Sequence, residues 1–393
     1  MQHSILDPKI QEFINQNLDV PISKLALQKN PFLNIEWIKV LNQIEAKIKA
    51  KDKLPTWFKT ENIIYPSKIS VEQTSSEKTA SYKSHLVSGE NLIDLTGGFG
   101  VDDYYFATKI TNVTHCEIDP MLSSIVKHNM EQLGANNISC FSGDSLDTLK
   151  SLNTKWDWIY IDPSRRNDAK GKVFMLKDCL PNVPENLDFY FKNSSAILIK
   201  TAPLLDLSAG LAELKQVKTI HIIAAENEVK ELLWELHDGY LGETNIKTVN
   251  ILKDKTDTFE FIFKNEDSIP TFALPQNYLY EPNSAIMKSG GFNEVATTFN
   301  LSKLHRHSHL YTSQNIVDFP GRTFKIKNCF HYNKDEMKTH LSNSKANITI
   351  RNFPDTVDAI RKKWKIKEGG NVYCFFTTDE KNNKIVLICN KIK

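Results

Sequence analysis

Between residues 91 and 225, short apolar runs alternate with stretches of helical character. The runs are NLIDL, NVTHCEI, NISCF, WDWIYI, SAILIK and TIHIIAA, and MLSSIVKHNMEQLG is one of the helical stretches between them. This alternation is typical of β-α-β units, which build a mostly parallel, doubly wound sheet with helices on its faces. We therefore predict an α/β fold, with DTFEFIFK (residues 257–264) as a late edge strand.

The regions on either side of this alternation have a different character. In residues 1–85, apolar residues recur at helical spacing in LNIEWIKVLNQIEAKIKA, and a further short helix is capped near Ser75 or Ser76. Pro320 and Gly321 mark a late boundary, beyond which strand-like runs surround TVDAIRKKWKI. The predicted regions are a helical part (1–85), the α/β domain (86–270), a small module (271–320) and an α+β module (321–393).

The charge is unevenly distributed along the chain. Residues 321–393 hold 16 Lys and Arg against 7 Asp and Glu, a net charge of +9, whereas the remainder holds 33 against 40, a net charge of −7. A basic module on an acidic body predicts a polyanionic partner at that end. A solvated, lysine-rich surface is the alternative.

Composition and cysteine usage bear on the compartment. The chain of 393 residues is 40% hydrophobic and 24% charged, which is typical of soluble globular proteins. No apolar run approaches the ~20 residues of a membrane helix, and the first residues do not resemble a secretory signal. The six cysteines are scattered and form no CxxC pair. We therefore expect a cytoplasmic protein with reduced cysteines and no membrane partner.

A glycine-rich loop follows the first predicted strand. It runs from Asp94 to Gly100 (DLTGGFG) and opens a helix, and Glu117 ends the next strand, where a carboxylate is placed to bind ribose hydroxyls. A nicotinamide fingerprint has its third glycine where Asp103 stands, and Asp102 and Asp103 would repel a pyrophosphate. A pocket that contains these carboxylates and Asp94 favours a ligand with a sulfonium and no phosphate, namely S-adenosylmethionine (SAM).

In these features the segment from about Gln73 to Lys200 resembles class I SAM-dependent methyltransferases, which have a Rossmann-like fold. The resemblance implies contacts to SAM from Thr79, Lys83, Asp94, Thr96, Gly97, Gly98, Gly100, Glu117, Ile118 and Asp144. Thr96 stands where the commonest motif has glycine. Two alternatives remain open: a capped surface helix around Thr79 and Lys83, and a doubly wound domain that binds no SAM.

The whole chain resembles a narrower group. VEQTSSEKTASYK, DLTGGFGVD, IDPSRR, LYEPNSAIMKSGGF and the C-terminal module are similar to a bacterial methyltransferase family. In that family a small ferredoxin-like piece lies between the catalytic part and a THUMP-like domain. Because THUMP domains bind RNA, the resemblance implies an RNA partner.

The segment IDPSRR follows the fourth predicted strand, and Asp162 is therefore expected beside the methyl donor. Its carboxylate can accept a hydrogen bond from an exocyclic amine, and Pro163 stiffens the loop. Methyltransferases that act on amino groups of bases have [D/N]-P-P-[Y/F] here, where the aromatic stacks on the base. Ser164 and Arg165 replace the last two residues of that motif. We predict that Asp162 to Arg165 form the catalytic loop.

The role of the neighbouring cations stays open. Arg165 and Arg166 can stack on a base or bind a phosphate, or they can pair with Asp168 or Asp178. Lys200 is either a second polar group of the site or a solvated strand end. Since no cysteine follows this fifth strand, and Cys179 is expected in a helix of the core, we exclude covalent chemistry at C5 of uracil.

Two further clusters deserve interpretation. Arg361, Lys362, Lys363 and Trp364 would form a phosphate-facing stripe on a helix, or a solvated face with Trp364 in the core. His305, His307 and His309 would share one face of a strand, but no acidic or cysteine partner has ligand spacing, so no metal is expected.

Together these observations predict a SAM-dependent methyltransferase that acts on a nitrogen of an RNA base. Two alternatives remain, the first within enzymes and the second from another class. One is an N-methyltransferase of a protein or small molecule, and the other is a non-catalytic RNA-binding protein with a methyltransferase-like fold.

Overall fold

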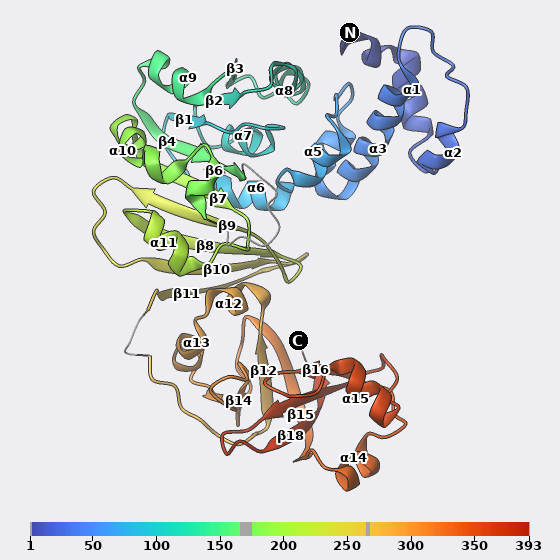
Figure 1. Cartoon of the computed structure of the whole chain (residues 1–393), viewed down its shortest axis with the longest axis vertical. Helices are drawn as coiled ribbons and strands as arrows, with labels where there is room; N and C mark the ends of the chain where they lie inside the picture. The colour runs from blue at the N-terminus through green and yellow to red at the C-terminus, as the bar shows by residue number, and fades with distance from the viewer. Residues whose placement is uncertain (1, 166–174, 265–267, 393) are drawn as a thin grey trace. The chain divides into compact units, whose positions relative to one another are not determined.

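The computed structural model describes residues 2–165, 175–264 and 268–392 (Figure 1). The chain divides into two compact units. The first unit consists of Met1–Lys218 and Leu233–Leu241, and the second consists of Thr219–Leu232 and Gly242–Lys393. In the part of the chain that is described, no helix has the length and apolarity needed to cross a bilayer.

The first unit begins with helices, as predicted. They are η1 (Gln2–Leu6), α1 (Pro8–Gln16), α2 (Ile22–Ala26), α3 (Trp37–Lys53), α4 (Pro55–Lys59), α5 (Lys68–Gln73) and α6 (Glu77–Ser84). The long helix α3 buries Val40, Leu41 and Ile44, whereas Ile38 is exposed. Ser76 caps α6 by accepting a hydrogen bond from the backbone N–H of Thr79, which confirms the predicted start of this helix.

Parallel strands and their crossover helices follow. The strands are β1 (Asn91–Asp94), β2 (Asn112–Glu117), β3 (Ile138–Ser142), β4 (Trp156–Ile161) and β7 (Ser194–Thr201). The helices between them are α7 (Val101–Phe106), α8 (Pro120–Gln132), α9 (Ser145–Leu152) and α10 (Val183–Asn193). The predicted α/β alternation is confirmed, because each predicted apolar run forms a strand.

The chain then continues through α11 (Leu207–Glu213), β8 (Val217–Ala225), β9 (Glu228–His237), β10 (Asn245–Ile251) and β11 (Thr256–Ile262). The strand order of the sheet is β11-β10-β8-β9-β7-β4-β1-β2-β3. β11 lies at an edge and pairs antiparallel with β10, as predicted for DTFEFIFK. A two-residue turn joins β8 to β9, and Glu226 and Asn227 in it have positive φ angles of 49° and 64°, which is the geometry of a tight hairpin.

The rest of the second unit contains a second sheet. Its strands are β12 (Tyr278–Pro282), β13 (Ser302–Lys303), β14 (Tyr311–Ser313), β15 (Gly321–His331), β16 (Asn347–Ile350), β17 (Val372–Thr378) and β18 (Lys384–Lys391), and its helices are α12 (Ser284–Ser289), α13 (Phe292–Thr298), α14 (Lys334–His340) and α15 (Val357–Trp364). The order is β13-β14-β12-β15-β18-β17-β16. β15 begins at the predicted boundary, residue 321, and pairs with strands from both sides of it, β12 and β18. The two small modules therefore share one sheet.

Candidate active site

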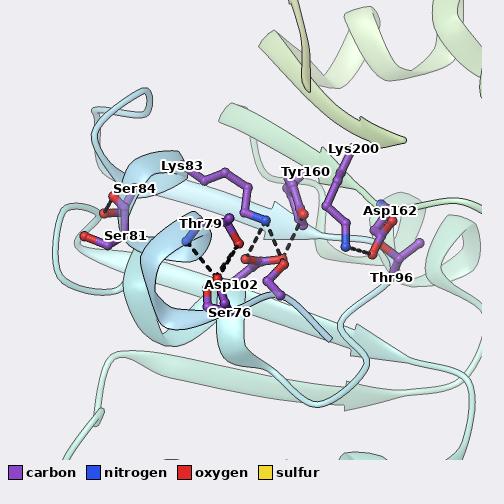
Figure 2. A network of polar contacts seen from close by, with 11 residues as sticks. Ser76, Thr79, Ser81, Lys83, Ser84, Thr96, Asp102, Tyr160, Asp162 and Lys200 are labelled. Atoms are coloured by element: carbon purple, nitrogen blue, oxygen red, sulfur yellow. Dashed lines mark hydrogen bonds and ion pairs between the residues drawn. The ribbon is translucent and has the colours of Figure 1, made fainter. Parts of the chain in front are cut away.

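The candidate site lies at the carboxyl ends of β1 and β4, where the strand order of the parallel sheet reverses. Ligands of doubly wound folds bind at such a switch point. The loop after β1 is attached to the end of β4, since the N–H of Leu95 donates to the carbonyl of Tyr160 at 3.0 Å. The hydroxyl of Thr96 accepts a hydrogen bond from the N–H of Asp162 at 2.7 Å (Figure 2). The glycine loop and the Asp162 loop are thus joined directly.

Thr96 shows why this loop can depart from the commonest motif. Its N–H and its hydroxyl both donate to Oδ1 of Asp94, at 2.7 and 3.0 Å, while the hydroxyl oxygen accepts the bond from Asp162. A glycine could make only the first of these three contacts. Further along the loop, Gly100 has a φ of 74°, and a Cβ added there would lie 2.6 Å from Cε of Met130. The backbone path at this position therefore requires glycine.

The carboxylate of Glu117 is fixed by two backbone donors at the end of β2. Oε2 accepts a bond from the N–H of Gly98 at 3.0 Å, and Oε1 accepts one from the N–H of Asp119 at 2.9 Å. The next side chain, Ile118, is 74% exposed. The exposed Asp144 follows β3 and caps α9, because its Oδ1 accepts from the N–H of Leu146 at 2.9 Å. This edge thus presents oriented carboxylates beside an exposed apolar side chain.

A buried ionic network connects α6 to α7 (Figure 2). Lys83, whose side chain is fully buried, pairs with Oδ1 of Asp102 at 2.9 Å and donates to Oγ of Ser75 at 2.7 Å. Oδ2 of Asp102 accepts bonds from the hydroxyls of Ser75 and Tyr160, at 2.8 and 2.9 Å. Burial alone would raise the pKa of Asp102, but Lys83 and Lys200 together with these donors hold it below its ordinary value.

Thr79 is also held within the protein. It is 1% exposed, and both its N–H and its hydroxyl bond to Ser76 in the cap of α6. Thr79 and Lys83, which are predicted to contact SAM, therefore already have hydrogen-bond or ion-pair partners within the protein.

Two more carboxyl groups lie beneath the loop. Asp94 and Asp103 are 2% and 0% exposed, and burial, together with the nearby charge of another aspartate in each case, raises the pKa of both well above the ordinary value. Nδ1 of His115 lies 2.7 Å from Oδ2 of Asp103, and burial lowers the pKa of this histidine. From the sequence, Asp94, Asp102 and Asp103 are expected to be charged groups that face a ligand. That expectation is wrong, because burial favours the neutral form of two of them and Asp102 is paired with Lys83.

Asp162 and Lys200 form an ion pair at the carboxyl ends of β4 and β7. Nζ of Lys200 lies 2.5 Å from Oδ2 of Asp162, and the two side chains are 11% and 39% exposed. Asp162 is the more exposed partner, and no described residue pairs with its Oδ1. Lys200 is therefore not a solvated strand end, and its role as a second polar group of the site stays a prediction.

The loop after β4, predicted to be catalytic, continues into a short hairpin. Pro163 is buried, and β5 (Ser164–Arg165) pairs with β6 (Cys179–Leu180), which follows η2 (Leu176–Asp178). Cys179 is buried but lies in this strand, so the prediction of a helix there is wrong. The side chain of Arg165, Arg166 and the possible partner Asp168 lie outside the described residues.

The proposed nucleic-acid stripe lies in the second unit on α15. Trp364 is 8% exposed and belongs to the core, and its indole N–H donates to the hydroxyl of Tyr332 at 3.1 Å. Lys363 lies over the ring of Tyr332 at 5.2 Å, and Lys362 is exposed. Arg361 donates to the carbonyl of Ile366 at 3.5 Å. Exposed cations are thus present on this helix, but its tryptophan packs inward.

The three histidines do not share the face of a strand, since residues 305–309 form a turn after β13. His305 bonds to Asn382 and Asn352, and His309 stacks on Phe292 with ring centroids 3.6 Å apart. Burial lowers the pKa of His309 to about 4. No cluster of three or more metal-ligating side chains occurs within residues 2–165, 175–264 and 268–392.

Sequence reasoning missed part of this site. Nothing predicted that the hydroxyl of Tyr160 reaches Asp102, or that Lys83 is buried against the same carboxylate. The only available signal was a tyrosine in the otherwise aliphatic end of WDWIYI. Long-range pairs of this kind leave no spacing pattern in a sequence.

Comparison with known proteins places these features in a family context. Residues 278–320 match a ferredoxin-like domain model, and residues 321–391 match a THUMP domain-like model. A crystal structure from Porphyromonas gingivalis W83, reported as a putative methyltransferase, is 29% identical, covers 100% of this chain and 99% of its own, and has a TM-score of 0.89. Among curated proteins, no match was found.

More distant solved structures overlap only in part. An O-methyltransferase from Bacillus cereus in complex with SAH is 12% identical, with a TM-score of 0.35, and covers 61% of this chain and 100% of its own. An rRNA methylase from Streptococcus thermophilus is 13% identical, with a TM-score of 0.30, and covers 41% of this chain and 93% of its own. The full-length match therefore supports a Rossmann-like methyltransferase fold, and the C-terminal part of the chain matches a ferredoxin-like and a THUMP-like domain.

Proposed function

We propose that this protein transfers a methyl group from SAM to a nitrogen of an RNA base. The observation that carries the proposal is the position of Asp162. Its backbone N–H is bonded to Thr96 of the glycine loop, one carboxylate oxygen is held by Lys200, and the side chain is 39% exposed. A carboxylate in this position is available to a substrate while its direction is fixed.

The residues at the edge of the sheet fit the cofactor. A Cβ at Gly98 would have only the carbonyl of Thr96 nearby, at 3.7 Å, so the loop is open to a ligand there, whereas Gly97 and Gly100 pack against His115 and Met130. The carboxylate of Glu117, fixed by two N–H donors, would bind the ribose, with Ile118 and Asp144 beside the adenine. Lys83 would act mainly by holding α6 against α7 through Asp102, and Thr79 by closing the cap of α6 with Ser76.

When bound, SAM supplies a methyl group made electrophilic by its sulfonium sulfur. Asp162 would accept a hydrogen bond from the target amine and point the nitrogen lone pair at the methyl carbon. The carbonyl of Pro163 would accept a second hydrogen bond. As the new C–N bond forms, the old C–S bond breaks with its electrons passing to sulfur, and the nitrogen releases a proton to Asp162 or to water.

RNA as the substrate is supported by the second unit. The match to a THUMP domain-like model covers the basic module, whose net charge is +9. Of the predicted stripe, Lys362 and Lys363 are exposed, while Trp364 is not available for stacking on a base. Phosphate contacts would hold the RNA, and the Asp162 loop would select the atom.

Transfer of labelled methyl from SAM to total cellular RNA, measured beside transfer to total protein, tests this proposal. Label in RNA that is released as an N-methylated nucleoside is the expected result. Label in protein alone would make the RNA assignment wrong, and absence of SAM binding by calorimetry would make the enzyme assignment wrong.

A further inference from the structure

A polar cavity lies within the second unit, and none of the residues of the candidate active site lines it. It has a volume of about 580 Å³ and is lined by the end of β12, the start of α12, the start of β15 and the residue that follows β16. The segment EPNS (residues 281–284) supplies one side of it. This segment is part of LYEPNSAIMKSGGF, a stretch to which the methyl-transfer reaction assigns no role.

A buried carboxylate holds the wall of the cavity together. Glu281 is 3% exposed, its Oε1 accepts a bond from Arg351 at 2.9 Å, and its Oε2 accepts one from Nε of Arg322 at 2.6 Å. One carboxylate therefore faces two guanidinium groups. Each guanidinium side chain is also partly exposed, by 34% for Arg351 and 39% for Arg322. The pairing thus leaves positive charge at the surface of the cavity.

The charges of the whole lining give an excess of two positive charges. Lys391, which is exposed, adds a third cation to the two arginines. The remaining charged groups are Lys255 and Asp257, which pair with each other at 2.5 Å. Four cations thus face two carboxylates.

Three buried donors on this lining lack a partner within the described part of the chain. They are Nδ2 of Asn283, Oγ of Ser284 and Nε of Arg351. Asn283 is 4% exposed, and its Oδ1 caps α12 by accepting a bond from the N–H of Ile286 at 3.0 Å. The cap fixes the orientation of the amide, and its NH₂ group has no partner among the described residues. Buried polar groups without partners are rare in proteins, and three on one cavity indicate a ligand rich in acceptor atoms.

We infer that this cavity binds a phosphate group. A phosphate monoester carries about −1.5 to −2 charges at pH 7 and three acceptor oxygens, which correspond to the excess charge and the three donors. A carboxylate ligand would bring half of that charge and fewer acceptors. Asn283 and Ser284 lie in the ferredoxin-like match and Arg351 lies in the THUMP-like match, so neither matched domain forms the site alone.

Titration of the full-length protein with inorganic phosphate tests the site, followed by calorimetry or by ³¹P line broadening. The key variant is Asn283→Asp, which keeps an oxygen for the cap of α12 but replaces the free NH₂ donor with an acceptor. We expect it to weaken phosphate binding by about tenfold or more. Ser284→Ala and Lys391→Gln should weaken it severalfold, and they keep the test decisive if Asn283→Asp folds poorly.

Lys327→Gln is the matched control, because Lys327 is an exposed cation of β15 that does not line the cavity. It should bind phosphate as the wild type does. Absence of phosphate binding to the wild type, or equal binding by the control and all three cavity variants, would overturn the inference.

Two RNA oligonucleotides of one sequence, with a 5′-phosphate or a 5′-hydroxyl, identify the source of the phosphate. If only the 5′-phosphorylated oligonucleotide displaces inorganic phosphate, the cavity is a phosphate site that binds the end of an RNA. Competition by neither supports the same site filled by a small phosphorylated molecule. These titrations contain no SAM, so their outcome is independent of whether the protein transfers methyl groups.

Discussion

Asp162 and Lys200 leave adjacent strands of the parallel sheet at equivalent positions and form an ion pair there. Ile161 of β4 pairs with Ile199 of β7, so the next residue of each chain segment emerges at the same edge. Nζ of Lys200 is 2.5 Å from Oδ2 of Asp162. The register of the sheet therefore fixes the direction of the Asp162 carboxylate. This is the carboxylate proposed to accept a hydrogen bond from the acceptor nitrogen.

Lys200→Met should reduce methyl transfer more than it reduces cofactor binding. Without the ammonium group, the carboxylate of Asp162 can rotate, and small misplacements of a reacting group cost up to about 100-fold in rate. We expect kcat to fall by about tenfold or more, with a Kd for SAM close to the wild-type value. Lys200→Arg should recover part of the activity, since it restores a cation. Equal kcat in Lys200→Met and the wild type would show that the ion pair has no role in the reaction.

Lys83→Met should destabilise the fold. The substitution leaves Asp102 buried without its cation, and breaking a buried pair costs roughly 3 kcal/mol in the free energy of unfolding. Lys109→Met, at an exposed position, is the matched control and should change stability by less than about 0.5 kcal/mol. Urea denaturation of both variants measures the difference. Equal stability of the two would contradict a structural role for the pair.

The contribution of this pair should also depend on pH. The pKa of Asp102 is lowered in the folded protein, so the folded state binds fewer protons than the unfolded state near the ordinary value of about 4. The stabilisation is therefore fully present above that pH and is lost as the pH falls through the lowered pKa. The stability difference between the wild type and Lys83→Met should shrink as the solution is acidified. A difference that grows on acidification would contradict the sign of the shift.

Gly100→Ala should cost more stability than Gly134→Ala. Both glycines have a φ of 74°, so the backbone strain of an alanine is similar, about 1 kcal/mol. Only at Gly100 would the new Cβ lie 2.6 Å from Met130 and 2.8 Å from Val126, whereas nothing lies within 4 Å at Gly134. We expect a further 1–3 kcal/mol, roughly, at Gly100 from overpacking. Thermal or urea unfolding of the two variants separates strain from packing, and equal losses would argue against the tight contact.

Much of the first unit's fold was predictable from local patterns. The apolar runs that form β1–β4, β7 and β8 are short, continuous and bounded by polar segments. This sequence pattern is typical of buried parallel strands. The strand β9 was missed because EVKELLWELH mixes charges with apolar residues at a spacing that does not indicate a strand. Its position is set by distant contacts, since Trp234 is fully buried and donates to the hydroxyl of Thr201 at 3.0 Å.

The sequence indicated which residues lie together in the candidate site better than it indicated their burial, protonation and partners. Asp162, Glu117 and the glycine loop lie together as the strand order requires. Burial and partners leave no pattern in the sequence, which therefore indicates neither the raised pKa of Asp94 and Asp103 nor the pairing of Lys83 with Asp102. The threonine at position 96 seemed a departure from a motif, yet it joins the two loops of the site.

RNA affinity should depend on exposed cations of α15 and the residue after it. Because β15 pairs with β12, deleting residues 321–393 would disrupt the second sheet, so substitutions are the better test. Lys362→Gln with Lys365→Gln should weaken RNA binding for all sequences and lower the steepness of its salt dependence, because fewer counterions are released. The pair Lys9→Gln and Lys51→Gln removes the same charge from exposed positions in the first unit and serves as the control. An equal salt dependence in both double variants would exclude α15 from the RNA surface.

The central claim, that Asp162 aims the acceptor nitrogen at the methyl group of SAM, is tested most directly by Asp162→Ala. The measurement is the single-turnover rate of labelled methyl transfer to total RNA, together with the Kd for SAM by calorimetry. Asp147→Ala, at a side chain that is 78% exposed, is the matched control. The account predicts that Asp162→Ala lowers the rate by about 100-fold or more while the Kd for SAM changes by less than about threefold. Transfer to RNA at the wild-type rate in Asp162→Ala would contradict it.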